Sequence, residues 1–125
     1  MNKSYVVEFP DGTATYLNAN LIAKQNVSDK NLDLIKHSHI YRWQLIKDME
    51  AAIDDPAELQ LLAKKIEEVD FYLQGLWGFE KNADFHKWWE LPGCNCGIMD
   101  AKDTYGTSYR YYSSECPIHA WKQTT

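Results

Sequence analysis

The chain of 125 residues has no long apolar run, only six glycines, four prolines and three cysteines, and no excess of basic residues. A membrane-spanning helix needs about 20 consecutive apolar residues, so we expect none here. Residues 1–10 hold one lysine and no long apolar stretch, and we expect them to form the first strand of the fold rather than a signal peptide. The glycines form no phosphate-binding loop.

The net charge is −5 and is unevenly distributed. Residues 1–85 carry nine Lys/Arg and fourteen Asp/Glu, whereas residues 86–125 carry four of each and are neutral. Proteins that hold duplex nucleic acid by its phosphates usually present a basic surface. The charge therefore weighs against duplex binding by the whole chain and leaves a local patch open.

The N-terminal residues predict a β-hairpin. Residues 4–9 and 13–17 are rich in β-forming side chains, and Pro10-Asp11-Gly12 lies between them. Proline presets φ in such a turn and glycine accepts a positive φ. Residues 18–26 fit a loop or a short helical turn.

Two amphipathic helices are predicted next. Ser28 or Asp29 caps the first, which extends to about Ile53. Its apolar stripe consists of Leu32, Ile35, Ile46, Met49 and Ile53, widened by Leu34, Tyr41, Leu45 and Ala52 and interrupted by His39 and Arg42. Asp55, Pro56 and Glu58 predict the cap and first turn of the second helix. In the second helix, steps of three and four residues join Leu59, Leu62, Ile66, Val69, Leu73 and Leu76, and Gly75 and Gly78 loosen its end.

The first helix is expected to end near Ile53 and the second to begin at Asp55, so the link between them is very short. A link of this length predicts an antiparallel hairpin. The apolar seam has two open interpretations, a core within one chain or a surface wide enough to form a homodimer with four helices. Of His37 and His39, we expect one at the surface and one at the seam, because positions two apart on a helix face away from each other.

The acidic residues near the helix link have two interpretations. These residues are Asp48, Glu50, Asp54, Asp55 and Glu58, followed by Glu67, Glu68 and Asp70. The first interpretation is a solvated face with helix-capping acids. The second is a surface that engages a basic partner or mimics nucleic acid.

All three cysteines follow residue 93 and form two short ligand pairs with one histidine. Cys94 and Cys96 make the first pair, Cys116 and His119 make the second, and nineteen residues separate the pairs. Zinc takes four thiolate or imidazole ligands in a tetrahedron. We predict one structural Zn²⁺ at these four residues, which favours a reducing, cytosolic setting.

Four protein ligands leave no position for an activated water, so we expect the zinc to be non-catalytic and the protein not to be an enzyme. His86 is an alternative to one ligand, and three buried reduced cysteines are an alternative to the whole site. Residues 105–112 are strand-forming, so the sequence predicts a small β-hairpin in a zinc-ribbon or knuckle-like module. We expect residues 120–122 to form one helical turn.

The expected fold is therefore α+β, with a β-hairpin and a helical hairpin in residues 1–85 and a zinc-binding module in residues 86–125. The aromatic residues of segments 77–79 and 85–89 are expected to dock the module, although an exposed partner surface is the alternative. Tyr105, Tyr109, Tyr111 and Tyr112 fit either the core of a small hairpin or a platform for single-stranded bases.

One group of residues resembles a known family. It comprises Gly75-Leu76-Trp77-Gly78-Phe79, Phe85-His86-Lys87-Trp88-Trp89, Pro92-Gly93-Cys94-Asn95-Cys96, Asp100, Asp103, Tyr105-Gly106-Thr107 and Cys116-Pro117-Ile118-His119. Over residues 75–120 the pattern resembles small zinc-binding proteins encoded by tailed bacteriophages. Gly97 and Ala120 depart from it, where the family has proline and glycine, and neither change removes a ligand.

The resemblance implies a viral protein in the cytoplasm of an infected bacterial host, with zinc at the four named residues, and it implies no reaction. We expect a non-enzymatic phage accessory protein that binds a host or phage protein. The alternatives are a nucleic-acid-binding zinc protein and a structural virion component.

Overall fold

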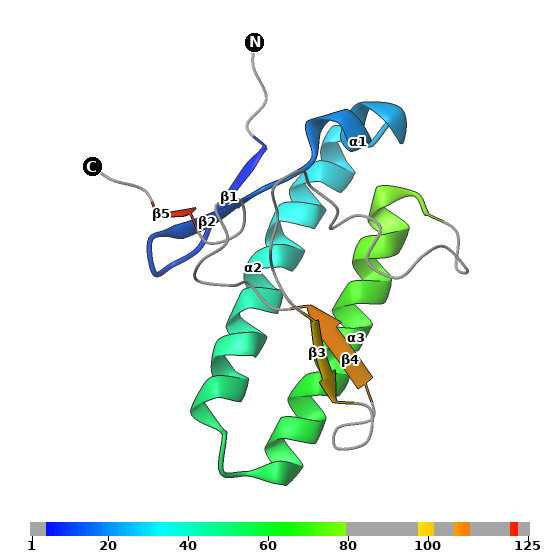
Figure 1. The fold of residues 1–125 in the computed structure, drawn as a ribbon. Helices are drawn as coiled ribbons and strands as arrows, with labels where there is room; N and C mark the ends of the chain where they lie inside the picture. The colour runs from blue at the N-terminus through cyan, green and yellow to red at the C-terminus, as the bar shows by residue number, and fades with distance from the viewer. Residues whose placement is uncertain (1–4, 80–97, 102–106, 111–120, 123–125) are drawn as a thin grey trace.

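The computed structural model describes residues 5–79, 98–101, 107–110 and 121–122. The elements are β1 (Val6–Glu8), β2 (Thr13–Tyr16), α1 (Ala19–Lys24), α2 (Asp29–Ala51), α3 (Pro56–Trp77), β3 (Ile98–Ala101), β4 (Thr107–Arg110) and β5 (Trp121–Lys122). Figure 1 shows α2 and α3 side by side as a helical hairpin, with the strands across one side of it. The predicted α+β order of a β-hairpin followed by a helical hairpin is confirmed.

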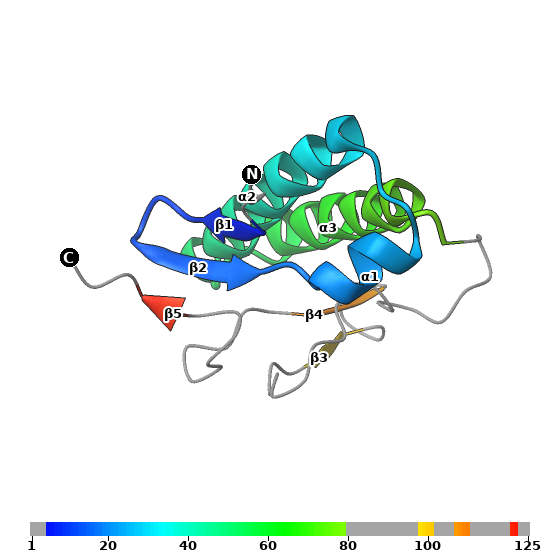
Figure 2. The same cartoon turned by 90° about the horizontal axis from the view of Figure 1, so that it is seen from above.

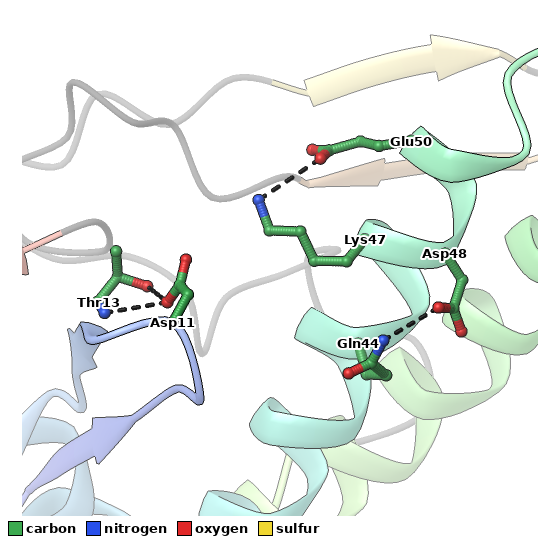
Figure 3. Close-up of polar contacts among 6 residues, drawn as sticks. All are labelled: Asp11, Thr13, Gln44, Lys47, Asp48 and Glu50. Atoms are coloured by element: carbon green, nitrogen blue, oxygen red, sulfur yellow. Dashed lines mark hydrogen bonds and ion pairs between the residues drawn. The ribbon is translucent and has the colours of Figure 1, made fainter.

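The N-terminal hairpin pairs β1 with β2 in antiparallel register, with Val7 opposite Thr15. Its turn has the predicted chemistry, because Gly12 adopts a φ of 89° that favours glycine. The Asp11 carboxylate accepts hydrogen bonds from the Thr13 N–H at 3.0 Å and from the Thr13 hydroxyl (Figure 3). Partial burial raises the pKa of Asp11, but these bonds and the nearby charge of Lys47 hold the pKa below its ordinary value.

The second edge of β2 pairs with β5, which places Ala14 opposite Trp121 in a sheet of order β1-β2-β5. The helical turn expected at residues 120–122 is therefore wrong, because Trp121 and Lys122 form a strand. A hairpin edge exposes unpaired N–H and C=O groups, and a further strand satisfies them. Periodicity could not reveal this pairing, because two residues are too few to show a pattern.

Residues 18–26, which the sequence left ambiguous, contain the short helix α1. The Asn18 side chain caps it by accepting a hydrogen bond from the Leu21 N–H at 3.0 Å, and Ile22 is buried in the core.

Two residues that follow α1 donate hydrogen bonds to the C-terminal end of α3. Gln25 Nε2 donates to the Trp77 carbonyl at 3.2 Å, and Asn31 Nδ2 donates to the Leu76 carbonyl at 3.3 Å. These two bonds satisfy carbonyls that the end of α3 would otherwise leave unpaired.

The helix boundaries follow the predicted caps. Ser28 accepts from the Asn31 N–H at 3.1 Å, and Asp55 accepts from the Glu58 N–H at 3.2 Å ahead of Pro56. At the other end of α3, the Gly78 N–H bonds the Gly75 carbonyl and the Phe79 N–H bonds the Gln74 carbonyl. This is a Schellman motif, with Gly78 at a φ of 86°. The helix thus ends sharply at Trp77, and Gly75 lies within it rather than loosening it.

The apolar stripes form the core, except for Tyr41 and Ile53, which are exposed. All six seam residues predicted for α3 are buried, as are Leu32, Ile35, Ile46 and Met49 of α2. Ile53 is 68% exposed and the prediction for it is wrong. The backbone N–H of Ala52 caps α2 on the Asp48 and Met49 carbonyls, so the helical period no longer directs the side chain of Ile53.

The strands and α1 lie on one side of the helical hairpin, as Figure 2 shows. Phe9 stacks on Trp43 of α2 with ring centroids 5.5 Å apart, and Lys47 Nζ lies 5.7 Å from the Trp43 ring centroid. The stack of Phe9 on Trp43 attaches the β-hairpin to α2, and the Lys47 contact lies within α2. Strand β4 lies against α3. Among the described residues, no helix is long and apolar enough to cross a membrane.

We predict opposite effects of alanine at the two glycines near the end of α3. Gly78→Ala should lower the free energy of unfolding by about 1 kcal/mol, because an L side chain is strained at positive φ. Gly75→Ala should raise it by about 0.5 kcal/mol, because a Cβ there meets nothing within 4 Å and alanine favours the helix. Urea denaturation measures both, and equal shifts would contradict the Schellman cap.

Candidate functional site

The four predicted zinc ligands, Cys94, Cys96, Cys116 and His119, lie outside the described residues. So do His86 and the aromatic residues of segment 85–89. Strands β3 and β4 pair in antiparallel register between the two ligand pairs, where the sequence predicts a small β-hairpin. The part of the chain that the structure describes contains no cluster of three His, Cys, Asp or Glu residues that could hold a metal. The zinc site stays a prediction.

A groove with a volume of about 370 Å³ runs between α2 and α3. It is lined by Leu34, His37, Ser38 and Tyr41 from α2 and by Lys65, Glu68, Val69 and Tyr72 from α3. Most of the exposed wall is apolar, and the charges of Lys65 and Glu68 stand at one wall. This groove cannot be predicted from the periodicity of either helix, because it arises where the outer flanks of two helices meet.

The groove opens away from the strands. Trp43 marks the side of α2 that meets the β-hairpin, since it stacks on Phe9. Tyr41 precedes Trp43 by two residues, and two residues on a helix turn the side-chain direction by about 200°. Tyr41 and Tyr72 are each 51% exposed, so two large aromatic side chains stand at the groove in contact with solvent.

The groove contains a serine and a histidine, but their placement is poor for acid–base chemistry. Ser38 directly follows His37 on α2. Consecutive positions on a helix point about 100° apart, so the imidazole is not directed at the neighbouring hydroxyl. What these side chains offer together is hydrogen-bonding capacity beside two aromatic rings, an arrangement suited to recognition of another molecule.

Behind the groove, the helices are joined by a buried ion pair. Arg42 Nε of α2 lies 2.7 Å from Asp70 Oδ1 of α3, and the two side chains are 0% and 2% exposed. Such a pair has no access for a substrate. Its role is to neutralise two charges inside the seam, because one charge buried alone costs several kcal/mol.

Two more polar side chains lie near this pair. His39 is buried one turn before Arg42, and Gln74 is buried one turn after Asp70. Because the helices are antiparallel, both positions lie toward the same end of the hairpin from the ion pair. The expectation of one histidine at the seam and one at the surface is confirmed, since His39 is buried and His37 is exposed.

The interpretation of Asp70 as part of a solvated acidic face is wrong, because this residue is buried. The signal was present in the sequence, since Asp70 follows Ile66 by four residues and precedes Leu73 by three, which is seam spacing. Arg42 interrupts the other stripe and requires a carboxylate partner if buried. By contrast, Asp48, Glu50, Asp54, Asp55 and Glu58 are exposed as expected, and Asp55 caps α3.

Two further polar contacts on α2 involve exposed residues. Gln44 donates to Asp48 at 3.0 Å, and Lys47 Nζ lies 3.5 Å from Glu50 Oε2 (Figure 3). The Lys47 and Glu50 side chains are largely open to solvent, so this pair contributes little to stability. It provides an exposed comparison for the buried pair.

Comparison with family models, with curated proteins and with solved structures finds no match to this chain. We therefore draw the function from the residues themselves.

We predict that the buried pair is costly to break and far less costly to replace. Asp70→Ala should lower the free energy of unfolding by about 3–5 kcal/mol, because it leaves the Arg42 guanidinium buried without its carboxylate. The double variant Arg42→Met/Asp70→Leu should recover most of that loss. Urea denaturation and a double-mutant cycle measure the coupling.

The exposed pair supplies the control for this cycle. Glu50→Ala should change the free energy of unfolding by less than about 0.5 kcal/mol, since its partner Lys47 remains solvated. If Asp70→Ala were no more destabilising than Glu50→Ala, the buried pair would have no structural role.

Proposed function

We propose that the protein is a non-enzymatic binding protein that docks another protein molecule in the groove between α2 and α3. The observation that carries this proposal is the pair of half-exposed tyrosines, Tyr41 and Tyr72, at an apolar groove on the side of the hairpin away from the strands. Tyrosine is enriched at the centres of protein interfaces, where its ring supplies contact area and its hydroxyl a hydrogen bond.

The surroundings of the groove favour binding over chemistry. The ion pair behind it is sealed from solvent, and Ser38 and His37 point in different directions. The α-helices that carry the groove are capped at both ends and share one core, so the groove is held on rigid elements. A preformed surface loses little conformational entropy when it binds.

We further propose that one structural zinc ion is held by Cys94, Cys96, Cys116 and His119. The support is the donor set itself, three thiolates and one imidazole in two short pairs, with the β3–β4 strand pair between them. On the resemblance of residues 75–120 to small phage proteins, we also propose that the protein is a bacteriophage accessory protein that acts in the host cytoplasm.

Removal of one ligand tests the zinc. Cys116→Ser should lose the single zinc ion per chain and much of the folding of residues 86–125, because structural zinc contributes folding free energy. Metal analysis and circular dichroism of the purified protein measure both effects. The control His37→Ser removes an exposed histidine of the groove and should retain the metal. A parent chain without zinc that melts like Cys116→Ser would refute the site.

Two aromatic substitutions in the groove, compared with one outside it, test the binding. We expect Tyr41→Ser/Tyr72→Ser to weaken retention of the bound protein at least about tenfold in pull-downs from the bacterial host, because truncated aromatics lose most of their contact area. Phe71→Ser is the matched control, since Phe71 is also 51% exposed on α3 but does not line the groove.

Nuclease treatment separates the alternatives in the same experiment. Partners that persist after nuclease and depend on the two tyrosines support protein binding. Partners or nucleic acid that vanish with nuclease would favour the nucleic-acid-binding alternative. In a separate measurement, recovery of the chain from purified phage particles would favour a virion component. Equal losses in Phe71→Ser would contradict the groove as the binding surface.

A further inference from the structure

The outer surface of α3 carries a second row of side chains, distinct from its buried seam. The row is Leu61, Lys65, Glu68 and Tyr72, spaced by four, three and four residues. This spacing places all four on one face of the helix. Lys65, Glu68 and Tyr72 line the groove, and Leu61 continues the same row at 50% exposure.

The side chains of this row are complementary to the same row on a second, antiparallel copy of α3. From the N-terminal end it runs apolar, basic, acidic, apolar. If two copies of α3 lie antiparallel about a two-fold axis between residues 66 and 67, Leu61 faces Tyr72 and Lys65 faces Glu68, each in both directions. A parallel arrangement would place Lys65 against Lys65 and Glu68 against Glu68, which is repulsive.

We infer that the occupant of the groove is a second copy of this chain, packed with its α3 antiparallel to the first. The inference rests on the proposed protein-binding function of the groove and names the partner. Leu34 and Tyr41 of α2 form the second wall of the groove and extend the contact beyond α3. The helical hairpins of the two copies together form a four-helix arrangement, and the interface is the same patch on both copies, as a two-fold axis requires.

The charges of Lys65 and Glu68 are available for this contact. The ion pairs Arg42–Asp70 and Lys47–Glu50 use neither of these two side chains. Both side chains are exposed. Paired across the axis, they fix the register of the two helices, while the Leu61 and Tyr72 contacts supply apolar burial at the ends of the row.

The size of the surface predicts a reversible dimer. The row spans about 17 Å at a rise of about 1.5 Å per residue, and two helices packed about 10 Å apart give a face about 20 Å wide. Even with its margins, such a face buries on the order of 1,000 Å² in total, at the lower end of specific interfaces. Interfaces of this size are typical of weak, transient complexes, so we expect dissociation in the micromolar range.

Charge reversal tests the antiparallel register. Sedimentation equilibrium of the full chain, from about 1 to 100 μM, should show a monomer–dimer equilibrium. Lys65→Glu alone and Glu68→Lys alone should each weaken dimerisation at least about tenfold, because each creates two like-charge contacts across the axis. The double variant Lys65→Glu/Glu68→Lys should restore the dimer to within about threefold of the parent, because it recreates both pairs with their signs exchanged.

Circular dichroism controls for folding, since both positions are exposed and the variants should keep the parent's helical signal. A parent chain that is monomeric at 100 μM overturns the inference, as does a double variant that fails to restore the dimer. If the parent chain is monomeric and binds a host protein that Tyr41→Ser/Tyr72→Ser no longer retains, only the self-association is overturned and the proposed function stands. A dimer that follows the charge pattern, with no host protein bound, upholds the self-association and overturns only the accessory role.

Discussion

The arrangement of the helical hairpin depends on the neutralisation of Arg42. An arginine in a protein keeps its proton, so burial at 0% exposure requires a carboxylate at hydrogen-bond distance. Asp70 provides it at 2.7 Å, and this contact fixes both the rotation of α2 and its longitudinal register against α3. A shift by one helical turn would separate Arg42 from Asp70 and leave two buried charges without their partners, which costs several kcal/mol.

The same contact orients the neighbouring residues of α2. Tyr41, Arg42 and Trp43 are consecutive, and a helix points them about 100° apart. With Arg42 directed at Asp70, Trp43 meets Phe9 of the β-hairpin and Tyr41 faces the groove. Each of these three adjacent residues therefore lies on a different face of α2: Arg42 in the seam with α3, Trp43 against the β-hairpin and Tyr41 at the groove. The geometry of the proposed binding surface is therefore a consequence of a buried charge.

Local signals in the sequence were sufficient for most of the N-terminal fold. The caps at Ser28 and Asp55, the Gly12 turn and the seam of α3 each follow from interactions within a few residues. The features that escaped prediction depend on contacts between distant residues. The sequence predicts a surface position for Asp70, which is buried because its partner lies on another helix. It predicts a buried position for Ile53, which is exposed because α2 ends at Ala51. The groove escapes prediction because no single helix contains it.

The pairing of β5 with β2 joins Trp121 to Ala14, residues separated by more than one hundred positions, and it has consequences for the order of folding. Helices held by local contacts form quickly, whereas a strand pair at such sequence separation must first close a very large loop. During synthesis, β1, β2 and the helical hairpin emerge well before β5. Until β5 arrives, one edge of β2 remains a template for any extended segment, so the nascent chain carries an aggregation hazard that the pairing of Thr13 and Ala14 with β5 reduces.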